Sequence, residues 1–221
     1  MKVIIFGATG MVGQGVLLEC LDHSEVSAIL AVGRSSCGSD HPKLEELIHQ
    51  DFFDYSAIED KLTGYEACFF CLGVSAAGMS EEQYHRLTFK LTLGAAETLA
   101  RLNPTMTFCY VSGAGTDSSE SGRMMWARVK GKTENHLLQL PFKAAFMFRP
   151  GYIQPLKGIR SKTRLYQTFY TLARPLYPAL KTLFPSYVTT TEKLGLAMIE
   201  VALHGNTQPL LKNRDINALA S

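Results

Sequence analysis

A lysine and a tryptophan one helical turn apart are the first residues in this sequence whose spacing suggests chemistry. Trp126 and Lys130 lie in the stretch MMWARVKGKTEN, and residues four apart share one face of a helix. A lysine is rarely buried unless it is paired, so we expect Lys130 to point into a cleft. The indole N–H of Trp126 donates a hydrogen bond but does not titrate near neutral pH. The pair predicts a ligand contact at Lys130, with Trp126 as a core residue or pocket wall.

Three glycines follow the first apolar run, in VIIFGATGMVGQGV. Gly7, Gly10 and Gly13 stand between a predicted strand and an amphipathic helix. In such a turn one glycine allows the sharp bend, one lets the backbone approach a pyrophosphate, and one lets the helix pack close to the sheet. The phosphates lie at the helix N-terminus, where N–H groups are free. The pattern therefore predicts a dinucleotide-binding turn.

The end of the second predicted strand indicates which dinucleotide is bound. An Asp or Glu about 20 residues beyond the glycines usually binds the adenosine ribose of NAD. This chain has Arg34 and Ser35 there instead. An arginine cannot accept a hydrogen bond from a 2′-hydroxyl, but it can pair with a 2′-phosphate and stack on adenine. We therefore expect NADP(H) in preference to NAD(H).

The elements that must position these residues alternate between short apolar strands and longer helical patterns. This alternation is typical of an α/β fold with a doubly wound parallel sheet of the Rossmann type. We expect residues 1–150 to form the dinucleotide-binding core and 151–221 a small C-terminal helical lobe for substrate binding or as a lid, within one domain. Helices are expected near 80–102, near 123–140 and up to Gly205. The predicted strands are 2–6, 26–32, 44–50, 66–72, 106–112 and 144–149.

Composition narrows the class of protein. The chain has 221 residues, 46% hydrophobic and 19% charged, as in a soluble globular protein. Five cysteines and no signal-peptide pattern favour a reducing compartment, so we expect a cytoplasmic protein. Cys68 and Cys71 form a CxxC motif, but residues three apart on a strand point to opposite faces. We therefore expect neither a metal site nor a disulfide there.

The charge distribution is uneven. Residues 151–191 contain six Lys or Arg and no Asp or Glu, while the remainder of the chain carries 16 basic and 20 acidic residues. The basic, aromatic-rich stretch 157–184 is expected to act as a lid over an anionic substrate or as a helix that covers the sheet edge. An interfacial membrane helix is a less favoured alternative. No recognition motif accompanies the basic residues, so we expect no nucleic-acid partner.

Several stretches in chain order resemble one known family. GATGMVG, CFFCLGVS, YVSGAG, RVKGKTEN and FRPGYI together resemble the atypical short-chain dehydrogenase/reductases, most closely the Tat-interacting oxidoreductase-like branch, as a bacterial-type member. The resemblance covers essentially the whole chain. It implies an NADP(H)-dependent oxidoreductase acting on a carbonyl or alcohol substrate.

The resemblance also implies roles for individual residues. Ser112 would orient the substrate oxygen, and Lys130 would hold the nicotinamide ribose and lower the pKa of a catalytic tyrosine. Other residues would contact the cofactor at the pyrophosphate, the adenosine and the nicotinamide. These are Gly7, Thr9, Gly10, Met11, Val12, Gly13, Arg34, Ser35, Asp51, Phe52, Leu72, Gly73, Val74, Lys130, Pro150, Gly151, Tyr152 and Ile153.

The family pattern places the catalytic tyrosine four residues before the lysine, where this chain has Trp126. Three alternatives follow. In the first, the protein is an oxidoreductase whose proton donor is Tyr152, Tyr110, Ser112 or a water held by Lys130. In the second, it binds NADP(H) without turnover and regulates a protein partner. In the third, it is a non-redox enzyme or a peripheral membrane protein that uses its basic C-terminal lobe.

Overall fold

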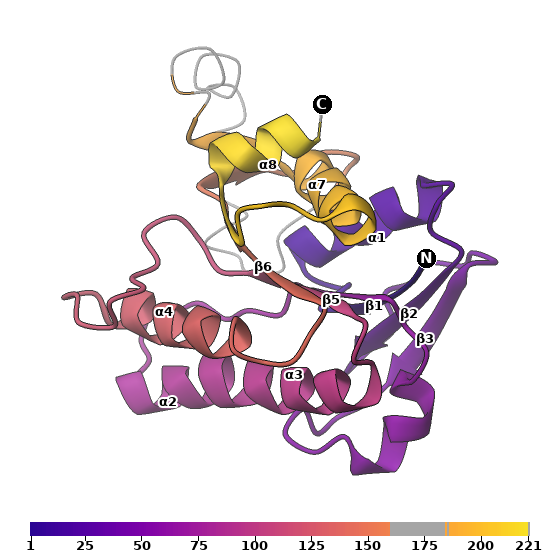
Figure 1. The fold of residues 1–221 in the computed structure, drawn as a ribbon, viewed down its shortest axis with the longest axis horizontal. Coiled ribbons are helices and arrows are strands. Elements are labelled where there is room, and N and C mark those ends of the chain that lie inside the picture. The colour runs from indigo at the N-terminus through magenta and orange to yellow at the C-terminus, as the bar shows by residue number, and fades with distance from the viewer. Residues whose placement is uncertain (160–183, 185, 221) are drawn as a thin grey trace.

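The computed structural model describes residues 1–159, 184 and 186–220. Its centre is a seven-stranded parallel sheet in the order β3-β2-β1-β4-β5-β6-β9 (Figure 1). The chain order reverses between β1 and β4, which is the switch point where doubly wound sheets bind ligands. The predicted fold class is confirmed. The strands are β1 (Lys2–Phe6), β2 (Ala28–Gly33), β3 (Leu44–Ile48), β4 (Ala67–Phe70), β5 (Thr107–Val111), β6 (Ala144–Arg149) and β9 (Leu210–Lys212).

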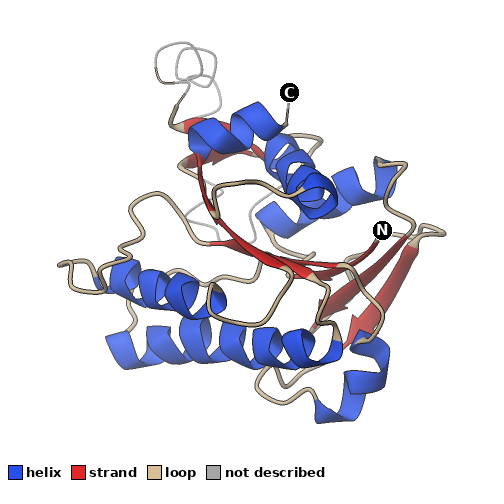
Figure 2. Cartoon of the chain, in the orientation of Figure 1, coloured by secondary structure: helices blue, strands red, loops and turns tan. Residues whose placement is uncertain are grey.

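Helices cover both faces of this sheet (Figure 2). One face carries α1 (Met11–Asp22), α7 (Thr191–His204) and α8 (Asn213–Leu219). The other carries α2 (Glu81–His85), α3 (Leu91–Leu102) and α4 (Met125–Leu137). A single π-helical turn, η2 (Arg86–Lys90), joins α2 to α3, and a 3-10 helix, η1 (Ser56–Leu62), precedes β4. Because all seven strands are parallel, their carboxyl ends lie along one edge of the sheet.

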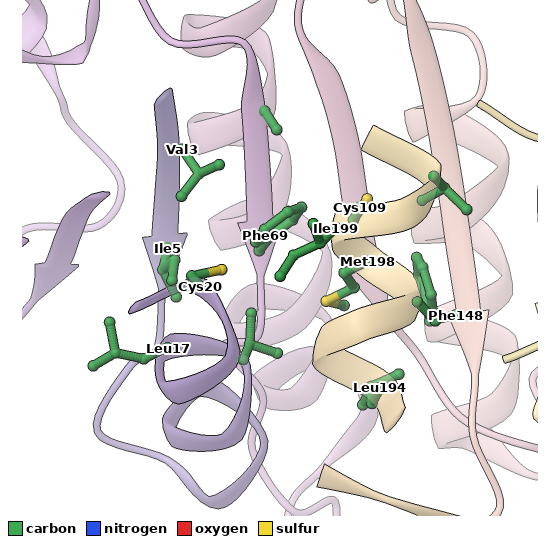
Figure 3. Packing of buried hydrophobic residues seen from close by; sticks show 14 of the residues in the cluster. Val3, Ile5, Leu17, Cys20, Phe69, Cys109, Phe148, Leu194, Met198 and Ile199 are labelled. Atoms are coloured by element: carbon green, nitrogen blue, oxygen red, sulfur yellow. The ribbon is translucent and has the colours of Figure 1, made fainter. Parts of the chain in front are cut away.

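The central strands are mostly apolar, as expected for strands whose two faces are both buried. All four residues of β4 are buried, and so are four of the five in β1. Alternate side chains enter two separate core clusters, one under each helical layer. Figure 3 shows the first cluster, where Ile5 and Phe69 of the sheet pack with Cys20 of α1 and Met198 of α7. The CxxC motif follows the same alternation: Cys68 lies in the second cluster, while Cys71 packs against the first.

The predicted long helix near 80–102 is confirmed, and so is its start. The Ser80 side chain accepts from the Gln83 N–H at 3.2 Å, and the Gln83 side chain accepts from the Ser80 N–H, forming a capping box. The π turn inside it was not predicted. The other two predicted helices correspond to α4 and to α7, which ends at Gly205.

The described residues beyond 150 complete the core. Strand β9 pairs with β6, and α7 crosses α1 so closely that a Cβ on Gly15 would lie 2.5 Å from the Thr191 side chain. Two further strands, β7 (Tyr152–Gln154) and β8 (Val188–Thr190), form a small parallel sheet. In the part of the chain that the structure describes, residues on both sides of position 150 therefore contribute to one sheet and one core.

Most of the basic, aromatic-rich stretch 157–184 lies outside the described residues. Its interpretations as a lid, a sheet-edge helix or a membrane-surface helix therefore stay predictions. Among the residues that are described, no helix combines the length and the apolar character needed to cross a lipid bilayer.

Candidate functional site

The turn after β1 has the geometry that its glycines predict. Gly7 has a φ of +83°, and a Cβ on it would lie 2.9 Å from the Cys71 carbonyl carbon. A Cβ on Gly13 would lie 2.0 Å from the Gly7 oxygen, so only glycine lets α1 approach the strand this closely. Helix α1 begins after Gly10 without a side-chain cap, which leaves its first N–H groups without intrahelical partners. These donors are available to an anion.

Beside this turn lies a cavity of about 190 Å³, which we call the glycine-turn pocket. Several predicted cofactor residues share it, together with Cys37 and Glu46, which were not predicted. The predicted residues that line it are Gly7, Thr9, Arg34, Ser35, Phe52 and Leu72.

Other predicted cofactor residues stand outside the glycine-turn pocket. Met11 and Val12 are partly buried and pack against the apolar core. Asp51 is exposed, and its carboxylate accepts from the Phe53 N–H at 2.9 Å. Gly73 and Val74 lie in the loop after β4, where the Val74 side chain is exposed.

Glu46 lines the same glycine-turn pocket as Arg34. It accepts hydrogen bonds from the Cys37 N–H and from the Ser36 hydroxyl, the latter at 2.8 Å. The hydrogen bonds from Cys37, then that from Ser36, hold the pKa of Glu46 below its ordinary value. The pocket therefore holds one cation, Arg34, and one anion near neutral pH. Glu46 was not predicted, because no pattern in the sequence relates its position in β3 to Arg34.

A buried ion pair fixes the surroundings of Ser112 at the end of β5. Glu134 of α4 is fully buried, and both of its oxygens accept from Nε of Arg149 at 3.0 Å. The Ser112 hydroxyl donates toward Glu134 and toward the Phe148 carbonyl. A buried carboxylate needs such partners to offset its lost hydration. The one proton of Ser112 is therefore directed into the protein.

Lys130 reaches the same strand end from α4. Its ammonium group donates to the backbone carbonyl of Ser112. Burial lowers the pKa of Lys130 to about 8, although the nearby charge of Glu134 acts in the opposite direction. Glu134 lies one turn beyond Lys130 on the same helix face, a spacing in the sequence that could have revealed it.

Trp126 forms a wall one turn before Lys130. Its side chain is partly buried, and its ring lies against Gly115, where a Cβ would be 3.3 Å from the indole. Two of the proposed alternative proton donors are otherwise engaged. Tyr110 is 1% exposed within the core under α3, and burial raises its pKa far above the ordinary value. The Tyr152 hydroxyl donates to the Gln154 side chain at 2.8 Å.

A second cavity, of about 290 Å³, opens at the carboxyl ends of β5, β6 and β9. We call it the basic pocket, after the three cations Arg149, Lys212 and Arg214 that line it. Of the predicted segment Pro150–Ile153, Gly151 lines this pocket. The Pro150 carbonyl accepts from the Ala114 N–H at 2.7 Å. The Ile153 side chain lies in the core instead.

Comparison with solved structures supports the fold alone, because sequence identities are low. The *Bordetella bronchiseptica* enzyme WbmF in complex with NAD+ superposes with a TM-score of 0.67 at 15% identity, over 99% of this chain and 76% of that one. MoeE5 in complex with UDP-glucose and NAD gives a TM-score of 0.68 at 13% identity, over 100% and 81%. A short-chain dehydrogenase/reductase family oxidoreductase from *Burkholderia thailandensis* gives 0.62 at 14%, over 91% and 85%.

Sequence relatives are more informative, although no family model matches the chain. Rat Protein HTATIP2 is 27% identical over 69% of this chain and 62% of its own length. Protein FMP52-2, mitochondrial, from *Scheffersomyces stipitis* is 30% identical over 72% of this chain and 68% of its own. Protein FMP52, mitochondrial, from *Meyerozyma guilliermondii* is 24% identical over 100% and 95%. The matches therefore span just under two thirds of the rat protein and more of the fungal ones.

These relatives correct two expectations. They come from a rat and from fungi, so the placement as a bacterial-type member finds no support. The expectation of a cytoplasmic protein is wrong, because the FMP52 relatives are named as mitochondrial proteins. The resemblance to atypical short-chain dehydrogenase/reductases is confirmed at the level of the family. Given its identity to the *S. stipitis* protein and its doubly wound sheet, the chain belongs to the FMP52 family, with the fold of the atypical short-chain dehydrogenase/reductases.

Proposed function

We propose that this protein binds NADP(H) across the carboxyl edge of its sheet and is an oxidoreductase for a carbonyl or alcohol substrate. The observation that carries the proposal is the turn after β1, where Gly7 and Gly13 have the close approaches that a pyrophosphate-binding turn requires. The neighbours WbmF and MoeE5 were solved with NAD, which supports a nicotinamide dinucleotide as the ligand class. The residues of the glycine-turn pocket would hold its adenosine half.

Arg34 supports NADP(H) over NAD(H). Arg34 and Ser35 both line the glycine-turn pocket, and a 2′-phosphate bound there could accept a hydrogen bond from each side chain. Glu46 in the same pocket repels such a phosphate. The preference is therefore a balance between Arg34 and Glu46, and we propose that the arginine prevails because it can neutralise the phosphate directly.

Lys130 is the residue best suited to handle the proton. When bound, NADPH supplies a hydride to the carbonyl carbon, and the carbonyl oxygen then needs one proton to give the alcohol. A group whose pKa lies near the working pH transfers protons most effectively. Lys130, with a pKa of about 8, meets this condition and could deliver the proton directly or through a water. The buried Tyr110 does not, because its pKa is raised far above neutral.

A second candidate is NADP(H) binding without turnover, in a protein that regulates a partner. Trp126 favours it, since an indole stands where the family pattern has the catalytic tyrosine and cannot exchange a proton near neutral pH. Loss of a general acid typically costs about 100-fold or more in rate. The protein partner would then respond to cofactor occupancy.

One experiment separates the two candidates. NADPH and NADH binding would be titrated first, followed by a screen of carbonyl compounds with the wild type, Trp126→Tyr and Trp126→Phe. Turnover by the wild type that is abolished in Lys130→Ala supports the oxidoreductase. Turnover only by Trp126→Tyr, with Trp126→Phe inactive as the matched control, supports the binding protein. If neither nicotinamide dinucleotide binds, both proposals are wrong.

A further inference from the structure

The basic pocket carries positive charge, and it is separate from the glycine-turn pocket proposed to hold the adenosine half of the cofactor. Arg149 ends β6, Lys212 ends β9, and Arg214 lies in the first turn of α8. No acidic side chain lines the pocket among the described residues. The glycine-turn pocket lies on the other side of the switch point, beside β1 and β2. Positively charged residues from three elements therefore line this one pocket.

The balance of charge in the basic pocket is positive. Arg149 is compensated by the buried Glu134. Lys212 and Arg214 are both exposed, and neither makes an ion pair with a residue that the structure describes. Asp215 is close, but the hydrogen bond of its carboxylate is with the backbone N–H of Lys212 at 2.8 Å. Two side-chain cations thus remain available to an anion.

Asn213 adds a buried donor to the wall of the same pocket. Its Oδ1 accepts from the Gly151 N–H at 2.8 Å, which fixes the orientation of the amide. The side chain is 4% exposed, and within the described residues its Nδ2 has no hydrogen-bond partner. Burying a donor without a partner is unfavourable, because the group gives up its hydrogen bonds to water. An oxygen atom brought to this wall by a ligand would remove that cost.

The basic pocket adjoins the residues assigned to the chemistry. Gly115 lines it and lies under the ring of Trp126. Arg149 lines it and shares Glu134 with Ser112. A ligand in the pocket would therefore lie next to the strand end where Lys130 donates to the Ser112 carbonyl.

We propose that the basic pocket binds an oxyanion group, a carboxylate or a phosphate, of the carbonyl substrate, and so makes this an enzyme for small anionic carbonyl compounds. Lys212 and Arg214 attract the anion, while Arg149 and Asn213 form the wall against which it binds. The reaction part of this inference rests on the proposed function, whereas the binding part does not.

Binding of three matched aldehydes tests the proposal: 4-formylbenzoate, 4-formylphenyl phosphate and the neutral methyl 4-formylbenzoate. Dissociation constants would be measured by ligand-observed NMR on the full chain, with and without NADPH. The variant Lys212→Gln/Arg214→Gln removes two pocket charges. The matched control Lys61→Gln/Lys90→Gln removes two exposed charges elsewhere and gives the same net charge.

The wild type should bind one or both anionic aldehydes more tightly than the ester, and the stronger of the two identifies the oxyanion. The pocket variant should lose roughly three- to tenfold in that affinity, while the control should lose little. Equal binding of acid and ester, or an equal loss in both variants, overturns the proposal. Oxyanion binding that persists in a protein unable to bind NADPH would support the pocket and refute the proposed function.

Discussion

Lys130 is held by a main-chain carbonyl, whereas the Ser112 side chain is held by Glu134. Lys130 therefore contacts the main chain of Ser112, while the Ser112 hydroxyl points to Glu134 instead. Burial disfavours the charged form of Lys130 and so lowers its pKa. The ion pair with Arg149 offsets the lost hydration of Glu134. Single substitutions can therefore test the pKa shift of Lys130 and the ion pair of Glu134.

Replacing Lys130 with Met should remove part of the pH dependence of stability. The pKa of Lys130 is about 8 in the folded protein, against an ordinary value of 10.5. Between these values the unfolded chain binds more protons, so the wild type's free energy of unfolding should rise with pH, by roughly 2–3 kcal/mol from this group. Urea unfolding at pH 8 and pH 10 measures it. The same rise in Lys130→Met would show that this lysine is not the cause.

Substitutions at Arg34 and Glu46 should move cofactor preference in opposite directions. Arg34→Gln should weaken NADPH binding about tenfold and NADH binding much less, because NADPH also loses the pairing of its 2′-phosphate with a cation. Glu46→Gln should strengthen NADPH binding a few-fold, because a like charge is removed while the amide can still accept from the Cys37 N–H. Fluorescence titration with both cofactors checks each variant. Parallel changes for NADPH and NADH would contradict the assignment of the phosphate site.

At the scale of elements, α4 is positioned by the loop that follows β5. A Cβ on Gly131 would lie 1.8 Å from the Asp117 oxygen, so helix and loop touch through their backbones. The Asp117 carboxylate in turn holds the loop, accepting from the Gly122 N–H at 2.6 Å and the Ser119 hydroxyl at 2.6 Å. This contact leaves no room for a side chain at Gly131, on the helix that carries Trp126 and Lys130.

Gly131→Ala should therefore destabilise the protein, although alanine favours a helix by about 1 kcal/mol over glycine. The backbone of the loop would have to move, and we expect a net loss of about 1–3 kcal/mol. Gly94→Ala in α3 is the matched control, because its Cβ would meet nothing closer than 3.7 Å. The control should be neutral or more stable in urea unfolding. Equal stability of the two variants would refute the close contact.

The sequence predicted elements better than it predicted how side chains pair. Apolar runs located the six strands of the first 150 residues, and the spacing of Ser80 and Gln83 located the capping box. Each of these signals is local in the sequence. Strand β9 was not predicted, because it has only three residues and forms by pairing with β6 rather than from a local pattern. Arg149 and Glu46 were missed for a related reason, since their roles depend on contacts between segments distant in the chain. Glu134 differs, because it lies at a local helical spacing from Lys130.

At the scale of the whole molecule, the two ends of the chain share one core. Leu17 of α1 and Met198 of α7 lie in the same buried cluster (Figure 3). Strand β9 belongs to the same sheet as β1. Because the described C-terminal residues contribute strands and helices to this core, they should unfold together with the N-terminal part.

Equilibrium unfolding should give one transition for every probe. The fluorescence of Trp126 reports on α4, on one face of the sheet, while circular dichroism reports on all helices, including α7 and α8 on the other face. Coincident urea curves from the two probes are expected. Two separated midpoints would show that residues beyond 150 form an independent unit.

Trp126 is the only tryptophan in the chain, and it lies against Gly115 at the rim of the basic pocket. Indole emits in the near-ultraviolet band that reduced nicotinamide absorbs and oxidised nicotinamide does not. A cofactor bound across this edge would therefore quench the tryptophan by resonance energy transfer only when it is reduced. The substitution that removes the usual catalytic hydroxyl would thus give the protein a built-in optical signal of the redox state of its ligand.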